Sequence, residues 1–249
     1  MPSEHGGWGL TLEPVLLGLL VAPSIAGVVL GVAAFLAFLV RTPLKLVAVD
    51  LRRDRWIDRS RLALRIAAVE LVFMAAMVVV AVTTAGWTWL VPAAVAAPLV
   101  AVELWFDVRS RGRRLVPELC GSIGIASVAA VIVVASGEAG SLAVGVWLVL
   151  AGRAVGAIPF VRTQIMRLRR GEASRRSSDV AQVGAVLIGV VAALVDDRVL
   201  AGLAGLVALG CLQIVWVRRR PVAAKVLGLR QMALGLGLVG VTAVGVLVS

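Results

Sequence analysis

Long apolar runs recur along the whole chain, and they constrain the fold more than any other feature. Most of these runs are close to the ~20 residues that an α-helix needs to cross a bilayer. Hydrophobic residues make up 61% of the sequence, and the mean hydropathy is +1.02. Such values exclude an ordinary soluble domain. We therefore predict an all-α, multi-pass membrane protein in which residues 1–249 form a single transmembrane domain.

The apolar runs also predict the number of helices. Residues 10–40 are too few for two full spans of about 20 residues each, but the break at Ala22-Pro23-Ser24 favours a tight hairpin of two short helices. One tilted, kinked helix is the alternative. The chain then has nine helices, or eight if residues 10–40 form one helix. The later spans are expected near 64–83, 88–105, 117–135, 141–160, 179–196, 198–217 and 226–248.

Basic residues are concentrated in every second connection, which predicts the orientation in the membrane. The basic loops are expected near residues 41–63, 106–116, 161–178 and 217–225. Because cytoplasmic loops carry an excess of Lys and Arg, we place these loops in the cytoplasm and the carboxyl terminus outside. The expected location is the bacterial inner membrane. This orientation, with contacts to anionic lipid headgroups, accounts for the net charge of +11, and nucleic acid is not an expected partner.

The most charged interruption runs from Arg41 to Arg65 and contains regularly spaced carboxylates. Asp50, Asp54 and Asp58 are four residues apart, a spacing that places them on one face of a helix. Such a ridge could hold Mg²⁺ and a diphosphate, because hard cations take carboxylate oxygens. The alternative is a solvated cytoplasmic helix with ion pairs. The arginines expected to bind phosphate or lipid headgroups are Arg52, Arg53, Arg113, Arg162 and Arg167.

Ionisable residues inside or at the edge of predicted spans are informative, because burying a charge in a membrane costs at least ~2.5–3.5 kcal/mol. Glu70 and Arg153 lie within spans, and Glu118 lies at an inner boundary. Arg153 is expected to pair with Glu70 or Glu118, or else to line a polar site. Gln182 and Gln231 add polar groups at the same ends of later helices. A cytoplasm-facing polar cavity is the natural interpretation.

The amino-terminal segment contains the only histidine, in a glycine-rich motif followed by a Glu-Pro pair. One histidine cannot form a metal site, and the chain contains no recognisable nucleophile or phosphate-binding motif. The opening EHGGWGLTLEP and the segments LAFLVRTPLKLVAVDLRR, VPELCGS and RTQIMRLRRGE resemble the YwiC-like family of bacterial membrane proteins. The family has no established activity to carry over. The positions that match its motif are His5, Gly6, Gly7, Trp8, Gly9, Glu13 and Pro14.

A second resemblance is to UbiA-type intramembrane prenyltransferases, which have nine helices and an Asp-rich loop between the second and third. Asp54 and Asp58 match the last two positions of their first acidic motif, whereas Asp50 is displaced by one residue and the asparagine is missing. The loop that should carry the second acidic motif holds only Glu172 and Asp179. The resemblance implies a UbiA-like bundle with a Mg²⁺–diphosphate site, and this departure weakens the case for an enzyme.

Three functional hypotheses remain open. The first is binding or transfer of a lipid (prenyl) diphosphate, with the aspartates holding Mg²⁺ and arginines neutralising phosphate. The second is a transporter for a small molecule or ion that uses Glu70, Glu118 and Arg153 as its polar path. The third is a non-catalytic membrane scaffold or accessory protein.

Overall fold

The computed structural model describes residues 5–249 except 110, 111, 113 and 172, with side chains from Gly9 onward. Eight of its helices are long and apolar enough to cross a membrane, and α1 adds a shorter apolar stretch from Gly9 to Val21. The described residues contain no strand, so the chain is an all-helical, multi-pass membrane protein. The α-helices are α1 His5–Val21, α2 Ile25–Arg52, α3 Asp58–Ala85, α4 Leu90–Val108, α5 Leu115–Ala135, α6 Gly140–Arg170, α7 Arg176–Val195, α8 Leu200–Trp216 and α9 Ala224–Val248, with a 3-10 turn, η1, at Asp197–Val199.

The first two helices form the predicted hairpin. α1 and α2 are separated by Ala22, Pro23 and Ser24, and the Ser24 hydroxyl accepts a hydrogen bond of 2.9 Å from the Gly27 amide at the start of α2. Pro23 lacks an N–H group, and Ser24 supplies the side-chain oxygen that the next helix needs at its amino end. The single kinked helix is therefore wrong. The second helix is not short, because α2 continues to Arg52 and makes most of the expected loop at 41–63 helical.

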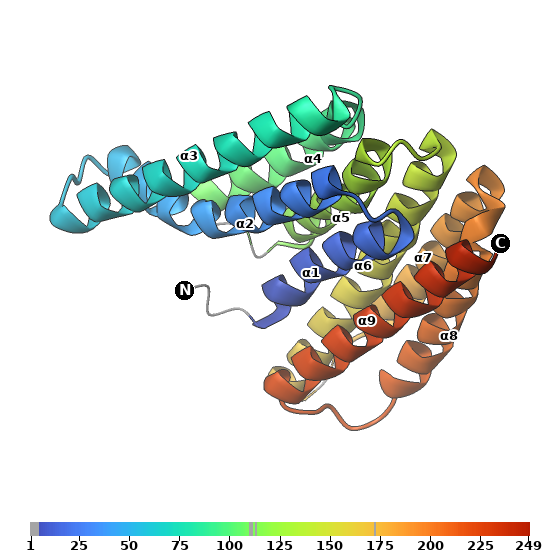
Figure 1. Ribbon diagram of the computed structural model, residues 1–249. Coiled ribbons are helices and arrows are strands. Elements are labelled where there is room, and N and C mark those ends of the chain that lie inside the picture. The colour runs from blue at the N-terminus through green and yellow to red at the C-terminus, as the bar shows by residue number, and fades with distance from the viewer. Residues whose placement is uncertain (1–4, 110–111, 113, 172) are drawn as a thin grey trace.

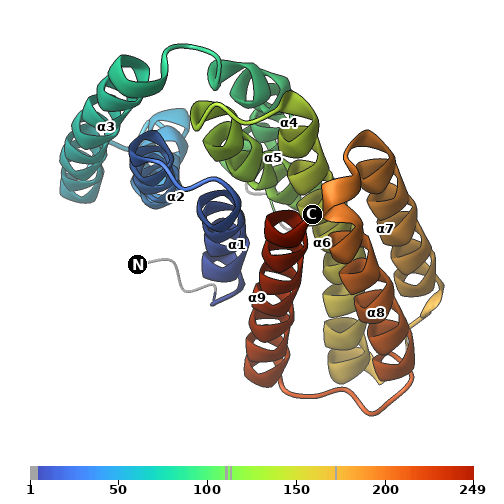
Figure 2. The ribbon, with the colours of Figure 1, turned by 45° about the vertical axis from the view of Figure 1, so that its right-hand side comes forward.

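The helices form two groups that diverge from a common centre (Figure 1). α2, α3 and α4 run together in one direction, whereas α1 and α6–α9 run in another. α5 joins the groups, since it packs against α1, α2, α4 and α6. Turning the molecule shows α1 between α2 and α9 (Figure 2). The two groups therefore share α1 and α5 as their meeting point.

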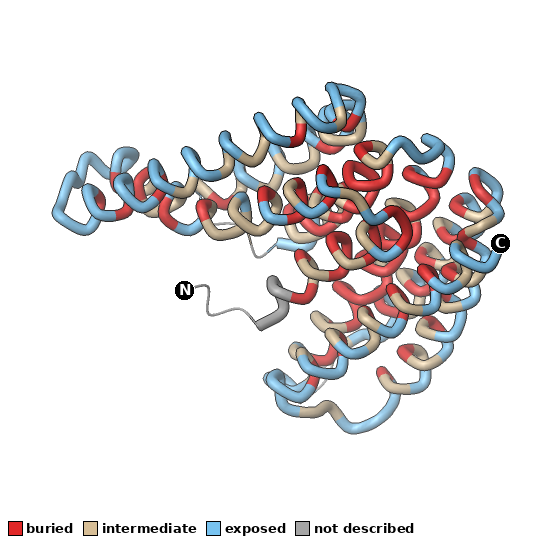
Figure 3. The backbone as a smooth tube through the Cα atoms, in the orientation of Figure 1, coloured by how far each residue is buried: buried red, intermediate tan, exposed pale blue. Residues whose placement is uncertain are grey.

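The core lies along α5 and α6. In an 18-residue apolar stretch of each helix, 61% of residues are buried in α5 and 72% in α6, against 11% in α3 and α4. Figure 3 shows the same concentration of buried positions at the centre of the molecule. Small residues permit this packing: a Cβ atom built on Gly152 of α6 would lie only 2.9 Å from the Ala185 carbonyl oxygen of α7. The exposed apolar faces of α3 and α4 suit contact with lipid.

Two arginine-rich connections lie apart from the apolar ones. Residues 53–57 lie at the left of Figure 1 and residues 217–223 at its bottom, away from the connection 86–89 at the top. We call the side of the bundle with these two connections the basic side. Helix α6 extends this side further than expected, because it remains helical to Arg170 and carries arginines in its last turn.

Candidate functional site among the C-terminal helices

The predicted aspartate ridge is wrong, because the three carboxylates do not share a helix. Asp50 lies near the end of α2, Asp54 is in the connection with a φ of 50°, and Asp58 is the first residue of α3. The carboxylate of Asp50 instead accepts hydrogen bonds from Arg59 Nη2 at 2.8 Å and from Ser60 Oγ at 2.7 Å. Asp50 therefore ties α2 to α3, and it is not free for a ligand.

The structure does not bring together ligands for the Mg²⁺ ion that the UbiA resemblance implies. Within the described residues, no three His, Cys, Asp or Glu side chains lie close enough to hold a metal ion. The Asp58 side chain is fully exposed, and its contact with Arg61 spans 3.4 Å. The residues present therefore do not fit the metal site.

Most of the arginines expected to bind phosphate instead hold other parts of the protein. Arg162 Nη1 lies 2.7 Å from Glu118 Oε2 and joins α6 to α5. Arg167 donates to the backbone carbonyls of Val217 and Arg219. The outcome for the other three is mixed: Arg52 donates to the Val108 carbonyl at 3.2 Å, Arg53 is exposed, and Arg113 lies outside the described residues.

A buried polar network crosses the inner part of the bundle and links five helices. Arg153 of α6 donates from Nη1 to Gln231 Oε1 at 3.1 Å and from Nη2 to the Gln231 carbonyl of α9 at 2.7 Å. Gln213 of α8 extends the network, since its Nε2 lies 3.5 Å from Gln231 Oε1 and its Oε1 accepts from Gln182 of α7 at 3.1 Å. Glu13 of α1 completes it, with Oε1 3.8 Å from Arg153 Nη2.

Arg153 therefore has a different acidic partner from those expected. Glu118 pairs with Arg162, and Glu70 of α3 has a buried Oε2 atom without a hydrogen-bond partner among the residues that the structure describes. The true partner, Glu13, belongs to the amino-terminal motif. Glu13 is 3% exposed and Arg153 is 4% exposed, so this pair is removed from water. An ionisable pair at this depth marks a functional site unless another role is shown.

Sequence reasoning identified Arg153, Gln182 and Gln231 as polar groups but missed Gln213. Gln213 follows LAGLAGLVALGCL, and a single amide near the end of an apolar run carries little signal by itself. The positions of the glutamines in their helices do indicate Gln213. Gln182, Gln213 and Gln231 each lie within about two turns of the basic end of their helix, so antiparallel packing places them at similar depths.

A glycine on α9 makes room for Glu13. A Cβ atom at Gly235 would lie 1.7 Å from Glu13 Oε1. We expect Gly235→Ala to lower the free energy of unfolding by about 1–3 kcal/mol, because the added methyl group forces Glu13 from its place. Gly237→Ala is the matched control: no atom lies within 4 Å of its built Cβ, and alanine favours a helix over glycine by up to ~1 kcal/mol. Unfolding curves in detergent measure the stability of both variants. Equal stability of Gly235→Ala and Gly237→Ala would contradict the close approach of Glu13 to Gly235.

A basic cavity lies beyond the network, toward the basic side of the same helices. It encloses about 350 Å³ between α6, α8, α9 and the connection from α8 to α9. Its lining residues are Phe160, Gln164, Trp216, Arg219, Arg220, Val222, Leu227 and Arg230. A larger hollow of about 590 Å³ borders Arg167 and Arg175, but its lining has no aromatic side chain.

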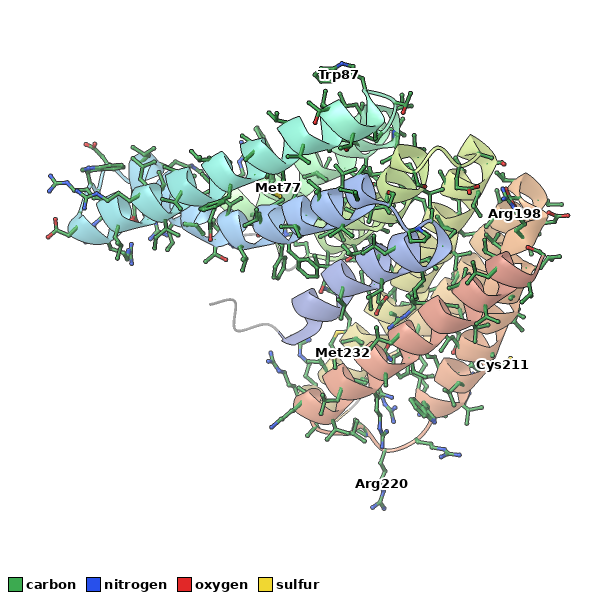
Figure 4. All side chains as sticks on the ribbon, in the orientation of Figure 1. Met77, Trp87, Arg198, Cys211, Arg220 and Met232 are labelled. Atoms are coloured by element: carbon green, nitrogen blue, oxygen red, sulfur yellow. The ribbon has the colours of Figure 1, made fainter. Side chains whose placement is uncertain are left out.

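The cavity combines cationic and apolar walls. The Arg230 guanidinium carbon lies 5.2 Å from the centre of the Trp216 ring, which places a cation against an aromatic face. In the part of the chain that the structure describes, no carboxylate forms an ion pair with Arg219, Arg220 or Arg230. Figure 4 shows Arg220 extending away from the helices, so its guanidinium reaches outward from the rim. These features suit an anionic group attached to an apolar one.

The comparisons with known proteins support the first of the two resemblances. The family model for the YwiC-like protein matches residues 1–133, which is more than half of the chain. The chain belongs to the YwiC-like family. No curated protein and no solved structure matches it, and the likeness to UbiA-type prenyltransferases is not shown by these comparisons.

The YwiC-like match ends before most of the candidate site. It covers α1 to α4 and most of α5, so Glu13 is the network residue that it includes. Of the motif, the side chains of His5, Gly6, Gly7 and Trp8 lie outside the described residues. Gly9 packs against Met232 of α9, with 3.6 Å between its built Cβ and Met232 Cγ, and Figure 4 shows Met232 beside the start of α1. The motif helix therefore docks on the carboxyl-terminal half.

Proposed function

We propose that this YwiC-like protein binds a phosphate-bearing amphiphile at the cytoplasmic leaflet of the bacterial inner membrane. The observation that carries the proposal is the basic cavity between α6, α8 and α9. Arg219 and Arg230 provide planar guanidinium groups, which form bidentate hydrogen bonds with phosphate oxygens. Phe160, Val222 and Leu227 give the same cavity an apolar wall. A ligand with a phosphate headgroup and a hydrocarbon chain matches both surfaces.

The proposal includes the membrane orientation. The basic side faces the cytoplasm and the carboxyl terminus lies outside, because Lys and Arg accumulate in cytoplasmic connections. Anionic lipid headgroups on the cytoplasmic surface attract such connections. The cavity then opens where phosphorylated lipids and lipid precursors are available.

A lipid (prenyl) diphosphate is one ligand of this class. The separated positions of Asp50, Asp54 and Asp58 give no support to Mg²⁺-dependent prenyl transfer, so the proposal concerns binding. Arginines can hold a phosphate directly, without a metal ion. Binding should therefore persist when Mg²⁺ is removed.

Thermal unfolding of the purified protein in detergent tests this proposal. A non-hydrolysable prenyl diphosphate analogue at ~100 times its dissociation constant should stabilise the native state by about 2.7 kcal/mol. We expect the same increase with Mg²⁺ or EDTA. In Arg219→Ala/Arg230→Ala the increase should fall at least severalfold, since two of the three arginines that line the cavity are lost.

The control is Arg53→Ala/Arg55→Ala, which removes two exposed arginines from the connection between α2 and α3. It changes the net charge equally but leaves the cavity intact. An equal loss of stabilisation in the two double variants would show general attraction to a basic surface. A stabilisation that requires Mg²⁺ would contradict direct binding by arginine.

A further inference from the structure

The network around Arg153 has more hydrogen-bond donors than acceptors. A guanidinium carries five N–H groups, and two nitrogens of Arg153 already contact Gln231. Among the described residues, Arg153 Nε has no acceptor, although Arg153 is 4% exposed. Within the same residues, Gln231 Nε2 also lacks an acceptor and belongs to a residue that is 8% exposed. Two buried donors from neighbouring residues are therefore unpartnered at one place in the bundle.

The carboxylate that forms an ion pair with Arg153 makes no hydrogen bond with it. Glu13 Oε1 lies 3.8 Å from Arg153 Nη2, a distance that allows Coulomb attraction but is too long for a hydrogen bond. Arginine–carboxylate pairs are strongest when both oxygens meet two N–H groups. Glu13 neutralises the charge of Arg153 without using the donors that Arg153 offers.

We infer that Arg153, with Gln231, forms an intramembrane binding site for a carboxylate, and that Glu13 occupies this site as an internal competitor. The ligand class follows from the present occupant, because a carboxylate is the group that now faces Arg153. Gly235 borders the place that the Glu13 carboxylate fills, since its built Cβ would lie 1.7 Å from Glu13 Oε1. A free carboxylate can approach the guanidinium in the bidentate geometry that Glu13 does not reach from α1.

This inference does not depend on the proposed function. The amphiphile cavity is defined by residues nearer the basic side, and none of its lining residues is Glu13, Arg153 or Gln231. The two sites share α6, α8 and α9 but use different arginines. They can therefore be tested separately in the same protein.

Competition between Glu13 and a free carboxylate predicts the direction in which butyrate affinity changes, so butyrate is the probe. In Glu13→Gln the shape of the competitor is kept and its charge is removed. Sodium butyrate, substituted for sodium chloride at constant ionic strength, should raise the unfolding midpoint of Glu13→Gln. The apparent affinity should exceed that of the wild type by about tenfold or more, a typical size for coupling between two binding events. Neutral butyramide should have no such effect.

Two control variants decide the outcome. Glu13→Gln/Arg153→Met should lose the butyrate response, whereas Glu13→Gln/Arg219→Ala/Arg230→Ala should keep it. Loss of the response in the triple variant would assign it to the basic cavity and overturn the Arg153 site, leaving amphiphile binding intact. If Glu13→Gln does not fold, Glu13→Ala removes the same carboxylate without filling its place and must show the increased affinity. An equal response in wild type and variant overturns the inference.

Discussion

Glu13→Gln should lower the free energy of unfolding by about 3–5 kcal/mol, because it leaves a buried guanidinium without its acidic partner. Arg153 is 4% exposed, and Glu13 is the carboxylate that forms an ion pair with it among the described residues. A guanidinium does not release its proton in a protein, so Arg153 cannot relieve the loss by becoming neutral. Unfolding by sodium dodecyl sulfate from a mild detergent measures the change.

The double variant Glu13→Gln/Arg153→Met separates an ion pair from two independent packing effects. It contains no buried charge at this position, so we expect it to be more stable than Glu13→Gln. Arg153→Met alone should lower the free energy of unfolding less than Glu13→Gln does, since Glu13 can take up a proton. Contacting residues of one network are expected to be non-additive by about 0.5–3 kcal/mol. Strict additivity would contradict the pairing.

The sequence predicted the helices better than it predicted their contacts. Apolar length locates spans because every backbone polar group within a membrane must be satisfied inside its own helix. Pro23 and Ser24 likewise identify the first hairpin through local chemistry. The sequence placed the end of this second helix too early, because the last part of α2 is charged. Residues 41–52 are too charged for a membrane core, yet Arg41 and Lys45 find carboxylates on α4 and remain helical.

The candidate site was only partly predictable, because its members come from five helices. Spacing along one segment suggested the Asp50–Asp58 ridge, but the chain reverses between Asp54 and Asp58. Arg153 was identified from the cost of burying its charge. Its partner Glu13 is 140 positions earlier in the chain, and no local pattern connects the two. Hydropathy does not specify how the helices pack. It therefore does not show which glutamines face the same interior.

A second large effect is expected where α4 meets α2. Arg41 Nη1 lies 2.6 Å from Glu103 Oε1, and Arg41 Nε donates to Asp107 Oδ2 at 2.8 Å. Lys45 Nζ lies 3.1 Å from the other oxygen of Asp107. Arg41→Gln should lower the free energy of unfolding by about 1–3 kcal/mol, because two neighbouring carboxylates lose the cation between them. This is below the value for a fully buried pair, since the Arg41 side chain is 35% exposed.

The loss should be concentrated in α4. In the apolar stretch of this helix only 11% of residues are buried, and its packing partners are α5 and α2. Ion pairs therefore supply a large part of its attachment to α2. Hydrogen exchange in detergent should show faster exchange in α4 of Arg41→Gln, whereas α6–α9 keep their protection. Arg55→Gln removes an exposed arginine and should leave both groups unchanged. Uniform loss of protection across all helices would mean that Arg41 supports the whole bundle rather than the junction of α2 and α4.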